Sequence, residues 1–390
     1  MIVGSSCIQQ ATTRAATPRQ AVRELCETLG ATQNELGIVF VSPRYDREAF
    51  AAELHRYLPG TPWVGCTTAG EIAPSGYADD SAVAIVLPSE HFRVVVEPIE
   101  DLAHFSTQSG RHVAGTALAR LRTRGIAPSP TNTFALLLID GLSVREEFVV
   151  SSISAALGEI PLFGGSAGDA LQFRETAVLC NGAFARDRAV LVLIQTDLPF
   201  RVFKTQHFIP ANQKLVVTGA DAERRVVTEI NGEIARDEYA RLVGVSPEDL
   251  SPAVFAKNPV VVRVGGDTFV RAISRANPDG SLTFFCAIEE GVVLSLATGG
   301  NLVANLEAAF VEVSRVVGAP ELILGCDCIL RKLEIDRDGL RDAVGELFHR
   351  FHVVGFATYG EQIDSVHVNQ TFTGVAIGVK RADGTGPDAA

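Results

Sequence analysis

The chain has 390 residues, 47% of them hydrophobic and 21% charged, and a formal net charge of −12. This length allows two or three domains with buried cores, and the acidic balance argues against a nucleic-acid surface or an anionic membrane surface as partner. No apolar run approaches the ~20 residues that cross a bilayer, and no signal-peptide pattern opens the chain. Seven scattered cysteines favour reduced thiols, so we expect a cytoplasmic protein.

Residues 1–34 are predicted to form an N-terminal extension that contains one helix. Residues 1–17 are polar and are expected to be loosely ordered. The segment PRQAVRELCETLG (18–30) has an amphipathic pattern that ends at a glycine, which is typical of a helix and its C-terminal cap.

A unit of strand, helix, strand and glycine-rich loop follows. The run LGIVFV (36–41) is typical of a buried strand, and DREAFAAELHRYL (46–58) has apolar residues at helical spacing. The phrase WVGCTTAGEI (63–72) then predicts a short strand and a loop that ends at Glu71. A further apolar run, SAVAIVL (81–87), predicts a strand that closes the unit.

The same order of elements recurs twice, which indicates an internal repeat. In the middle copy the loop is one residue shorter and ends at Asp169, whereas the last copy ends at Glu361. The middle copy comprises FALLLID (134–140), REEFVVSSISAAL (145–157) and PLFGGSAGD (161–169), and the last comprises ELILGCDCIL (321–330), GLRDAVGELFHRF (339–351) and VVGFATYGEQ (353–362).

Between the second and third units the pattern changes to short apolar runs separated by turn signals, which predicts an antiparallel meander. These runs are residues 259–266, 268–276, 281–288 and 291–298. The predicted fold class is therefore α/β, with two lobes built from repeated strand–helix–strand–Gly-loop units and an antiparallel β insert in the second lobe. The predicted domains are 35–230 and 231–380, followed by a disordered tail at 381–390.

The three loops are the candidate ligand pocket, because glycine-rich turns expose backbone N–H groups and allow close approach. If the units pack together, the loops could line a shared cleft at the strand ends. The loop carboxylates would bind a ligand amine or would hold their own loops in shape, and both alternatives stay open. The candidate residues are Gly65, Thr67, Thr68, Gly70, Glu71, Gly165, Ser166, Gly168, Asp169, Thr358, Tyr359, Gly360 and Glu361.

Two rival motifs point to other chemistry. The segment GGSAG (164–168) matches G-x-S-x-G, but a nucleophile elbow requires a helix directly after the serine. The following residues, 169–180, predict a turn and then a strand, so a hydrolase that uses Ser166 is only a further alternative. Cys326 and Cys328 would lie on one face of a strand, either as core thiols or as a redox or metal pair, although no second pair at zinc spacing exists.

His207 is the candidate metal ligand among eight histidines. It follows a predicted strand and precedes Phe208 and Ile209, and an imidazole in apolar surroundings can bind a metal. The alternative is a hydrogen-bonded core histidine. His91, at the matching strand edge of the first unit, is the next candidate.

Several segments together resemble the FIST family of bacterial sensory proteins, with N- and C-terminal FIST domains, over about residues 35–380. The segments that carry this resemblance are VGCTTAGEI (64–72), LFGGSAGD (162–169), NGEIARDEY (231–239), GFATYGE (355–361) and HVNQTFTGVAIG (367–378). Three others are similar to the haem-binding branch described as nitric-oxide-sensing proteins. These are HFIP (207–210), SLTFFCAIEEG (281–291) and GCDCILR (325–331).

The resemblance implies a cytoplasmic, non-enzymatic sensor that binds haem b and, through it, nitric oxide. His207 is the assigned iron ligand, and the absence of C-x-x-C-H from the sequence implies non-covalent attachment. A partner histidine kinase or cyclic-di-GMP enzyme in biofilm control, and a homodimer, are further implications. The alternative function is a sensor of a small organic ligand, such as an amino acid, without haem.

Overall fold

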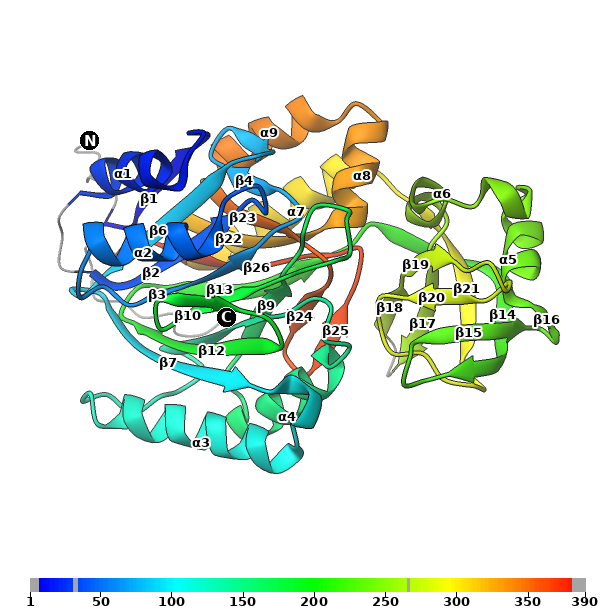
Figure 1. Ribbon diagram of the computed structural model, residues 1–390, viewed down its shortest axis with the longest axis horizontal. Coiled ribbons are helices and arrows are strands. Elements are labelled where there is room, and N and C mark those ends of the chain that lie inside the picture. The colour runs from blue at the N-terminus through cyan, green and yellow to red at the C-terminus, as the bar shows by residue number, and fades with distance from the viewer. Residues whose placement is uncertain (1–6, 31–33, 265–266, 381–390) are drawn as a thin grey trace.

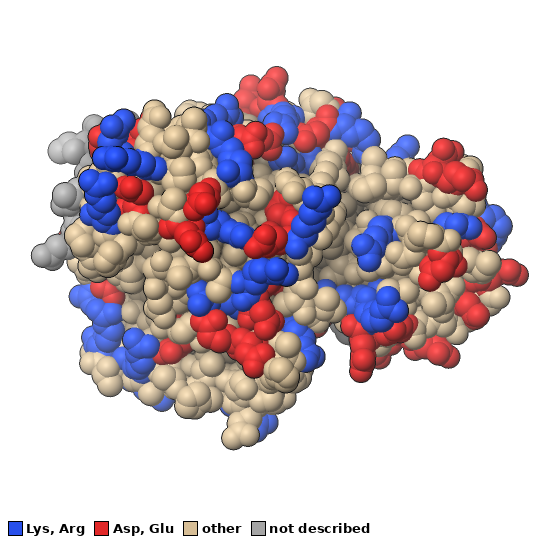
Figure 2. Space-filling view, viewed as in Figure 1, with Lys and Arg blue, Asp and Glu red and all other residues tan. Residues whose placement is uncertain are grey.

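The computed structural model describes residues 7–30, 34–264 and 267–380, so the predicted tail at 381–390 lies outside the described residues. Figure 1 shows a large α/β body and, beside it, a smaller lobe made mainly of β-strands. The α/β fold class with repeated units and an antiparallel insert is confirmed. Acidic and basic side chains are mixed on the face seen in Figure 2.

The first repeat begins earlier than the sequence suggests. Residues 9–13, expected to be loosely ordered, form a strand because they pair along an edge of the sheet with β6. The predicted helix at 18–30 is confirmed, and the Thr17 side chain caps it by accepting a hydrogen bond from the Gln20 amide. The elements are β1 (Gln9–Thr13), α1 (Pro18–Leu29), β2 (Asn34–Val41), α2 (Arg47–Tyr57), β3 (Trp63–Thr67), β4 (Glu71–Ala73), β5 (Gly76–Ala78) and β6 (Ala82–Pro88).

The second and third repeats follow the same plan. The second comprises β7 (Phe92–Glu100), η1 (Leu102–His104), α3 (Thr107–Arg122), β8 (Thr133–Ile139), α4 (Glu146–Leu157), β9 (Leu162–Ser166), β10 (Val178–Cys180), β11 (Ala183–Ala185) and β12 (Arg188–Thr196). The third comprises β13 (Phe200–Thr205), α7 (Leu302–Val317), β22 (Pro320–Cys328), α8 (Ile329–Arg337), α9 (Arg341–Arg350), β23 (Val353–Thr358), β24 (Glu361–Ile363), β25 (Val366–Val368) and β26 (Phe372–Gly378).

Each repeat forms a mixed sheet that another repeat completes. The central pair of strands is parallel in all three sheets, and β6, β12 and β26 flank these pairs antiparallel. The hairpin after each glycine-rich loop crosses to a neighbour: β4–β5 joins β23, β10–β11 joins β3, and β24–β25 joins β9. The three repeats therefore interlock in a cycle, and none completes its six-stranded sheet alone.

One glycine recurs at the same position of all three repeats, and the reason is steric. Gly65, Gly164 and Gly355 each occupy the third position of the second parallel strand. A Cβ atom at any of them would lie 1.8 to 1.9 Å from a carbonyl oxygen of the parallel neighbour. A glycine therefore occurs at the same position in every repeat, because no side chain fits there.

The core lies between the inner faces of the three sheets, and helices cover the outer faces. Phe40 of the first repeat stacks on Phe356 of the third, with ring centroids 4.3 Å apart. Apolar residues from all three sheets join this inner cluster. Separate clusters pack α1 and α2, α3 and α4, and α7 and α9 onto their own sheets. Burial of these apolar surfaces is the main force that holds the repeats together.

The smaller lobe comprises residues 208–299 and is inserted between β13 and α7. All of its strand pairs are antiparallel, as predicted, but β17 pairs with both β18 and β21, so the strands do not follow one another as a meander. The predicted strand at 268–276 is two strands. The elements are β14 (Phe208–Asp221), β15 (Val226–Ile230), β16 (Glu233–Ile234), α5 (Ala235–Val243), η2 (Pro247–Asp249), α6 (Pro252–Lys257), β17 (Val260–Val264), β18 (Asp267–Arg271), β19 (Ile273–Ala276), β20 (Leu282–Phe284) and β21 (Val293–Gly299).

Candidate ligand site at the junction of the two lobes

The structure brings the three predicted loops together, but their backbone groups bond to one another. The glycines serve this close packing: a Cβ at Gly168 would lie 2.8 Å from the Ala69 nitrogen, and one at Gly70 would lie 2.9 Å from Lys332. The loops therefore do not form an open cradle of free N–H groups. The contacts are Ala69 N to Ala357 O (2.9 Å), Gly168 N to Thr67 O (3.0 Å) and Ser166 N to Gly360 O (2.8 Å).

Glu71 and Glu361 hold their own loops in shape. Each buried carboxylate accepts hydrogen bonds from a threonine three residues earlier and from the amide and hydroxyl ten residues later. Burial raises the pKa of Glu71 to about 7 and that of Glu361 to about 8, against the opposing effect of these hydrogen bonds. The donors are Thr68 and Ser81 for Glu71, and Thr358 and Thr371 for Glu361.

Asp169 is not the counterpart of these two glutamates, contrary to the alignment of the three loops. Glu71 and Glu361 begin their hairpins, and the residue in that register in the second repeat is Val178. Asp169 instead accepts hydrogen bonds from the Tyr359 hydroxyl and from three backbone amides in the loop between β9 and β10, which is longer than its counterparts and not shorter as the sequence alignment suggested. Those amides belong to Phe173, Arg174 and Glu175, at 2.9, 2.8 and 2.8 Å.

Ser166 ends β9, and a loop and then β10 follow it, as the sequence predicts. Its hydroxyl oxygen accepts a hydrogen bond of 2.9 Å from the Gln362 side-chain amide. The helix that supports the serine in a nucleophile elbow is therefore not present at this position.

Four buried polar residues, Gln362, His367, Asn369 and Gln370, form what we call the junction cluster. None of them is more than 1% exposed. They lie on the hairpin β24–β25 and directly after it, where the hairpin packs against α4 and against β18 of the smaller lobe. The Gln370 amide also donates a 2.9 Å hydrogen bond to the Ala256 carbonyl of α6. The cluster is thus enclosed between the two bodies seen in Figure 1.

Five polar atoms of the junction cluster have no hydrogen-bond partner among the described residues. Buried polar groups in folded proteins are almost always paired, and each unpaired group costs about 1–3 kcal/mol. Five such atoms on and directly after one hairpin therefore make this the strongest candidate for a ligand site. The atoms are Gln362 Oε1, His367 Nε2, Asn369 Nδ2, Asn369 Oδ1 and Gln370 Oε1.

Two of these atoms are donors that face the same glycine. The Gln362 amide nitrogen lies 3.2 Å from His367 Nδ1, and since an amide N–H donates, Nδ1 accepts and Nε2 carries the proton. Burial lowers the pKa of His367 to about 4, which keeps the ring neutral at pH 7. A Cβ at Gly360 would lie 2.5 Å from His367 Nε2 and 3.1 Å from Asn369 Nδ2. Because Gly360 has no side chain, the N–H donors of His367 and Asn369 both face the same space beside it.

The smaller lobe contributes the cover of this site. Arg271 of β18 has a buried Nη1 atom without a partner in the described part of the chain, and it interacts electrostatically with His367. Arg225 ties the lobe to the body through a 2.5 Å ion pair with Glu146 and a 2.7 Å hydrogen bond to the Phe285 carbonyl. Aromatic rings line the same junction, and Tyr359 stacks on Phe173 with centroids 4.6 Å apart.

The surroundings of His207 do not fit a haem ligand. The Arg331 guanidinium donates to Nδ1 at 3.1 Å, and Nε2 donates to the Glu334 carboxylate at 2.9 Å. Both ring nitrogens are therefore engaged, and the side chain is 1% exposed. His91 is paired too, with Asp197 at 2.9 Å. The arrangement at His207 matches the alternative of a hydrogen-bonded core histidine.

All seven cysteines are unpaired in the structure. Cys326 and Cys328 are buried in β22, and burial raises the pKa of both thiols well above its usual range. In residues 7–30, 34–264 and 267–380, no group of three histidine, cysteine, aspartate or glutamate side chains could hold a metal ion. Likewise, no helix in those ranges has the length and apolar character needed to cross a membrane.

The sequence alone did not reveal the junction cluster. The letters HVNQ (367–370) were a signal, because three polar side chains interrupt an otherwise apolar pair of strands. Their burial depends on the hairpin crossing to β9 of the second repeat, which no local pattern encodes.

Comparison with protein families agrees with the repeat organisation. The FIST N domain model matches residues 35–233, and the FIST C domain model matches residues 235–364. No curated protein matches the chain. Because the two models together cover most of its length, the chain belongs to the FIST family, whose domains are sensory domains in signal transduction.

Proposed function

We propose that this protein senses a small zwitterionic molecule of the amino-acid type, which binds at the junction cluster. The observation that supports the proposal is the set of five unpaired buried polar atoms on and after one hairpin. Such atoms destabilise the protein unless a ligand or water pairs with them.

The unpaired atoms include both the hydrogen-bond acceptors and the hydrogen-bond donors that an amino acid needs. Three are carbonyl oxygens, of Gln362, Asn369 and Gln370, and an ammonium group has three N–H donors to offer. Two are N–H donors, on His367 and Asn369, and a carboxylate accepts such bonds. Arg271 adds a cationic donor from the smaller lobe, which favours the carboxylate further.

Coupling between binding and signalling follows from the position of the site. The junction cluster is covered in the present arrangement, so a ligand reaches it only if the smaller lobe shifts. A ligand that binds one arrangement of the lobes better than the other changes their populations. We propose that a partner histidine kinase or cyclic-di-GMP enzyme reads this change and that the protein itself catalyses no reaction.

A thermal-shift screen with the twenty amino acids tests the proposal. A ligand at one hundred times its Kd stabilises the folded state by about 2.7 kcal/mol, which raises the melting temperature measurably. The best ligand should lose at least ~10-fold in affinity when either its amine or its carboxylate is removed. Asn369→Ala should abolish the shift, whereas His55→Ala, on the exposed face of α2, should keep it. The proposal is refuted if no amino acid stabilises the protein or if Asn369→Ala responds like the wild type.

The haem and nitric-oxide prediction rests on the sequence resemblance alone, since the residues around His207 do not fit an iron ligand. Its test is the absorption spectrum of protein purified from cells supplied with haem precursor. A stoichiometric Soret band that shifts with nitric oxide would support haem binding. A band that is unchanged in folded His207→Ala protein would assign the iron to another residue.

A further inference from the structure

The boundary between the smaller lobe and the body has a pair of chain crossings at one end and a cluster of charged side chains at the other. We infer that the crossings are a hinge and that Arg225, Glu146 and Glu147 form a latch, so that the lobe is a lid over the junction cluster. The role of this lid depends on the proposed function, since the junction cluster is the ligand site that it covers. Figure 1 shows the two crossings beside α8 and the helix of the latch, α4, at the lower end of the boundary.

The hinge consists of two crossings that lie side by side. Phe208 begins β14 and pairs with Gly299 at the end of β21, and the Gly300 amide donates a 2.8 Å hydrogen bond to the His207 carbonyl. The His207 ring is hydrogen-bonded to two side chains of α8, which fixes this end of the boundary to the body. Adjacent crossings allow a lobe to rotate through changes in a few backbone angles, which is how hinged domains close on their ligands.

The latch joins the first turn of α4 to two segments of the lobe. The buried Arg225 guanidinium, in the turn between β14 and β15, donates to the Glu146 carboxylate at 2.5 Å and also to the Glu147 carboxylate. Arg225 donates as well to the Phe285 carbonyl within the lobe, at 2.7 Å. The Ala287 amide of the lobe donates to Glu147 at 2.5 Å. These contacts hold the lobe against the body at the end away from the hinge.

The latch lies beside the junction cluster. His367 interacts electrostatically with Glu147 and Arg225, and α4 packs against β25, the strand that carries His367. Phe285, whose carbonyl Arg225 binds, places its ring 6.3 Å from that of Tyr359, measured between centroids. The closed latch therefore keeps the lobe over the junction cluster, and its opening would expose His367.

An ionic latch is suited to repeated opening. Ions that separate regain their hydration, so a buried ion pair adds little net stability compared with apolar contacts of similar size. Removal of one partner has a much larger effect, because it leaves an uncompensated charge in the closed arrangement. Substitutions at the latch should therefore shift the lobe strongly towards the open arrangement.

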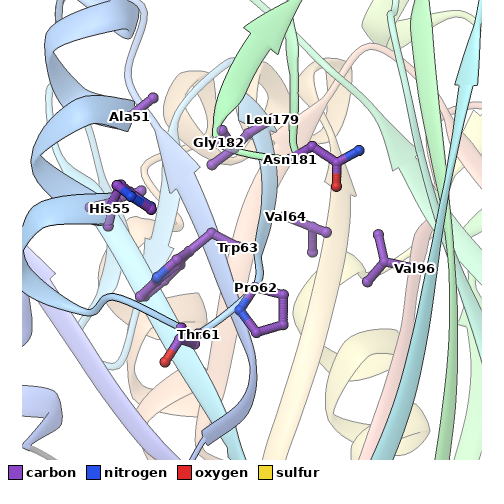
Figure 3. A pocket seen from close by; sticks show the side chains of 12 residues that line it. Ala51, His55, Thr61, Pro62, Trp63, Val64, Val96, Leu179, Asn181 and Gly182 are labelled. Carbon is purple, nitrogen blue, oxygen red and sulfur yellow. The ribbon is translucent and has the colours of Figure 1, made fainter.

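Diethyl pyrocarbonate, which acylates neutral histidine rings that solvent reaches, measures this opening without any ligand. His367 is 1% exposed, so its labelling in the folded protein requires the lid to open. The reference is His55, an exposed residue of α2 that lines a cavity of about 480 Å³ in the first repeat (Figure 3). His207, which is buried at the hinge, reports general unfolding. Mass spectrometry of peptides gives the labelling rate at each histidine.

Arg225→Gln should raise the ratio of His367 to His55 labelling at least ~10-fold, because it leaves two carboxylates without their cation. Labelling of His207 should stay slow. Arg236→Gln is the matched control, since Arg236 pairs at 2.8 Å with its neighbour Asp237 at the surface of the same lobe, and it should leave the ratio unchanged. Arg225→Lys keeps the charge without the two-armed guanidinium and should give an intermediate ratio.

The double variant Glu146→Gln/Glu147→Gln removes the latch from the side of the body, and it carries the same prediction if Arg225→Gln does not fold. An unchanged ratio in either folded variant overturns the latch. An equal rise at His207 would show general unfolding and would overturn the hinged lid as well. In the wild type, the best amino acid should slow the labelling of His367. Absence of that effect contradicts the proposed ligand and not the latch, because the latch is measured without ligand.

Discussion

A substitution of Asn369 should abolish the response to the ligand while changing the stability of the protein only slightly. Its side chain is fully buried and makes no hydrogen bond with the described residues, so Asn369→Ala removes no protein contact of this kind. The variant removes two unpaired polar atoms, which stabilises, and leaves a cavity, which destabilises, so we expect the free energy of unfolding to change by less than about 1 kcal/mol. Asn132→Ala is the matched control, because the Asn132 side chain accepts from the Ser129 amide at 2.9 Å and donates to the Ala127 carbonyl at 3.1 Å.

The control should lose about 2 kcal/mol, since it leaves two backbone groups without their partner. Urea denaturation of both variants measures the difference. Equal losses for Asn369→Ala and Asn132→Ala would mean that the Asn369 amide is satisfied in solution by a permanent partner, and the ligand site would lose its main support.

Glu361 should make the stability of the protein depend on pH. Its pKa is raised from 4.5 to about 8, chiefly by burial, so the folded protein keeps a proton that the unfolded chain releases. The stabilising effect of that proton is complete below pH 4.5 and is lost as the pH rises to about 8. Glu361→Gln removes the titrating group and should reduce the slope of unfolding free energy against pH by about 1.4 kcal/mol per unit between pH 5 and 7.

Glu361→Ala tests the effect of the hydrogen bonds that Glu361 accepts, apart from the effect of its charge. It leaves the Thr358 hydroxyl and the Thr371 amide without their acceptor and should destabilise the protein at every pH. Denaturant titrations at pH 5, 6 and 7 compare the three proteins. An identical slope in wild type and Glu361→Gln would show that this carboxyl is ionised throughout.

At the scale of elements, the repeated glycine should be intolerant of any side chain. Gly355→Ala would place a Cβ atom 1.8 Å from the Gly325 carbonyl oxygen, which forces β22 and β23 apart. We expect a loss of at least about 3 kcal/mol. Gly115→Ala, in α3 with open space around it, should instead stabilise by up to about 1 kcal/mol. A melting curve for each tests the pair, and a small loss at Gly355 would contradict the steric explanation.

The positions of individual helices and strands could be predicted from the sequence far better than the pairing of strands between repeats. Apolar spacing correctly predicted α1, α2, α4 and α9, because each helix buries one face against its own sheet. Strand crossing between repeats depends on contacts between residues far apart in the chain. For the same reason Asp169 was aligned with the glutamates, although Val178 occupies their register.

At the scale of the whole molecule, the order of the repeats and the inserted lobe along the chain differs from their arrangement in space. The third repeat packs with the first two, and residues 208–299 form the separate lobe. The FIST N model ends at residue 233 and the FIST C model begins at 235, which is inside that lobe. Both family domains therefore contribute to the lobe, and a ligand at the junction would contact parts of the chain that are far apart in sequence.

Hydrogen–deuterium exchange with and without the best amino acid tests most directly whether a ligand binds at the junction. The junction cluster lies in residues 361–371 and is joined to α6 through Gln370, so amides in these two segments should exchange more slowly with ligand. Helix α1, on the far side of the body from the smaller lobe in Figure 1, should be unchanged. Protection of other segments, with none in 361–371 or α6, would contradict a ligand site between the lobes.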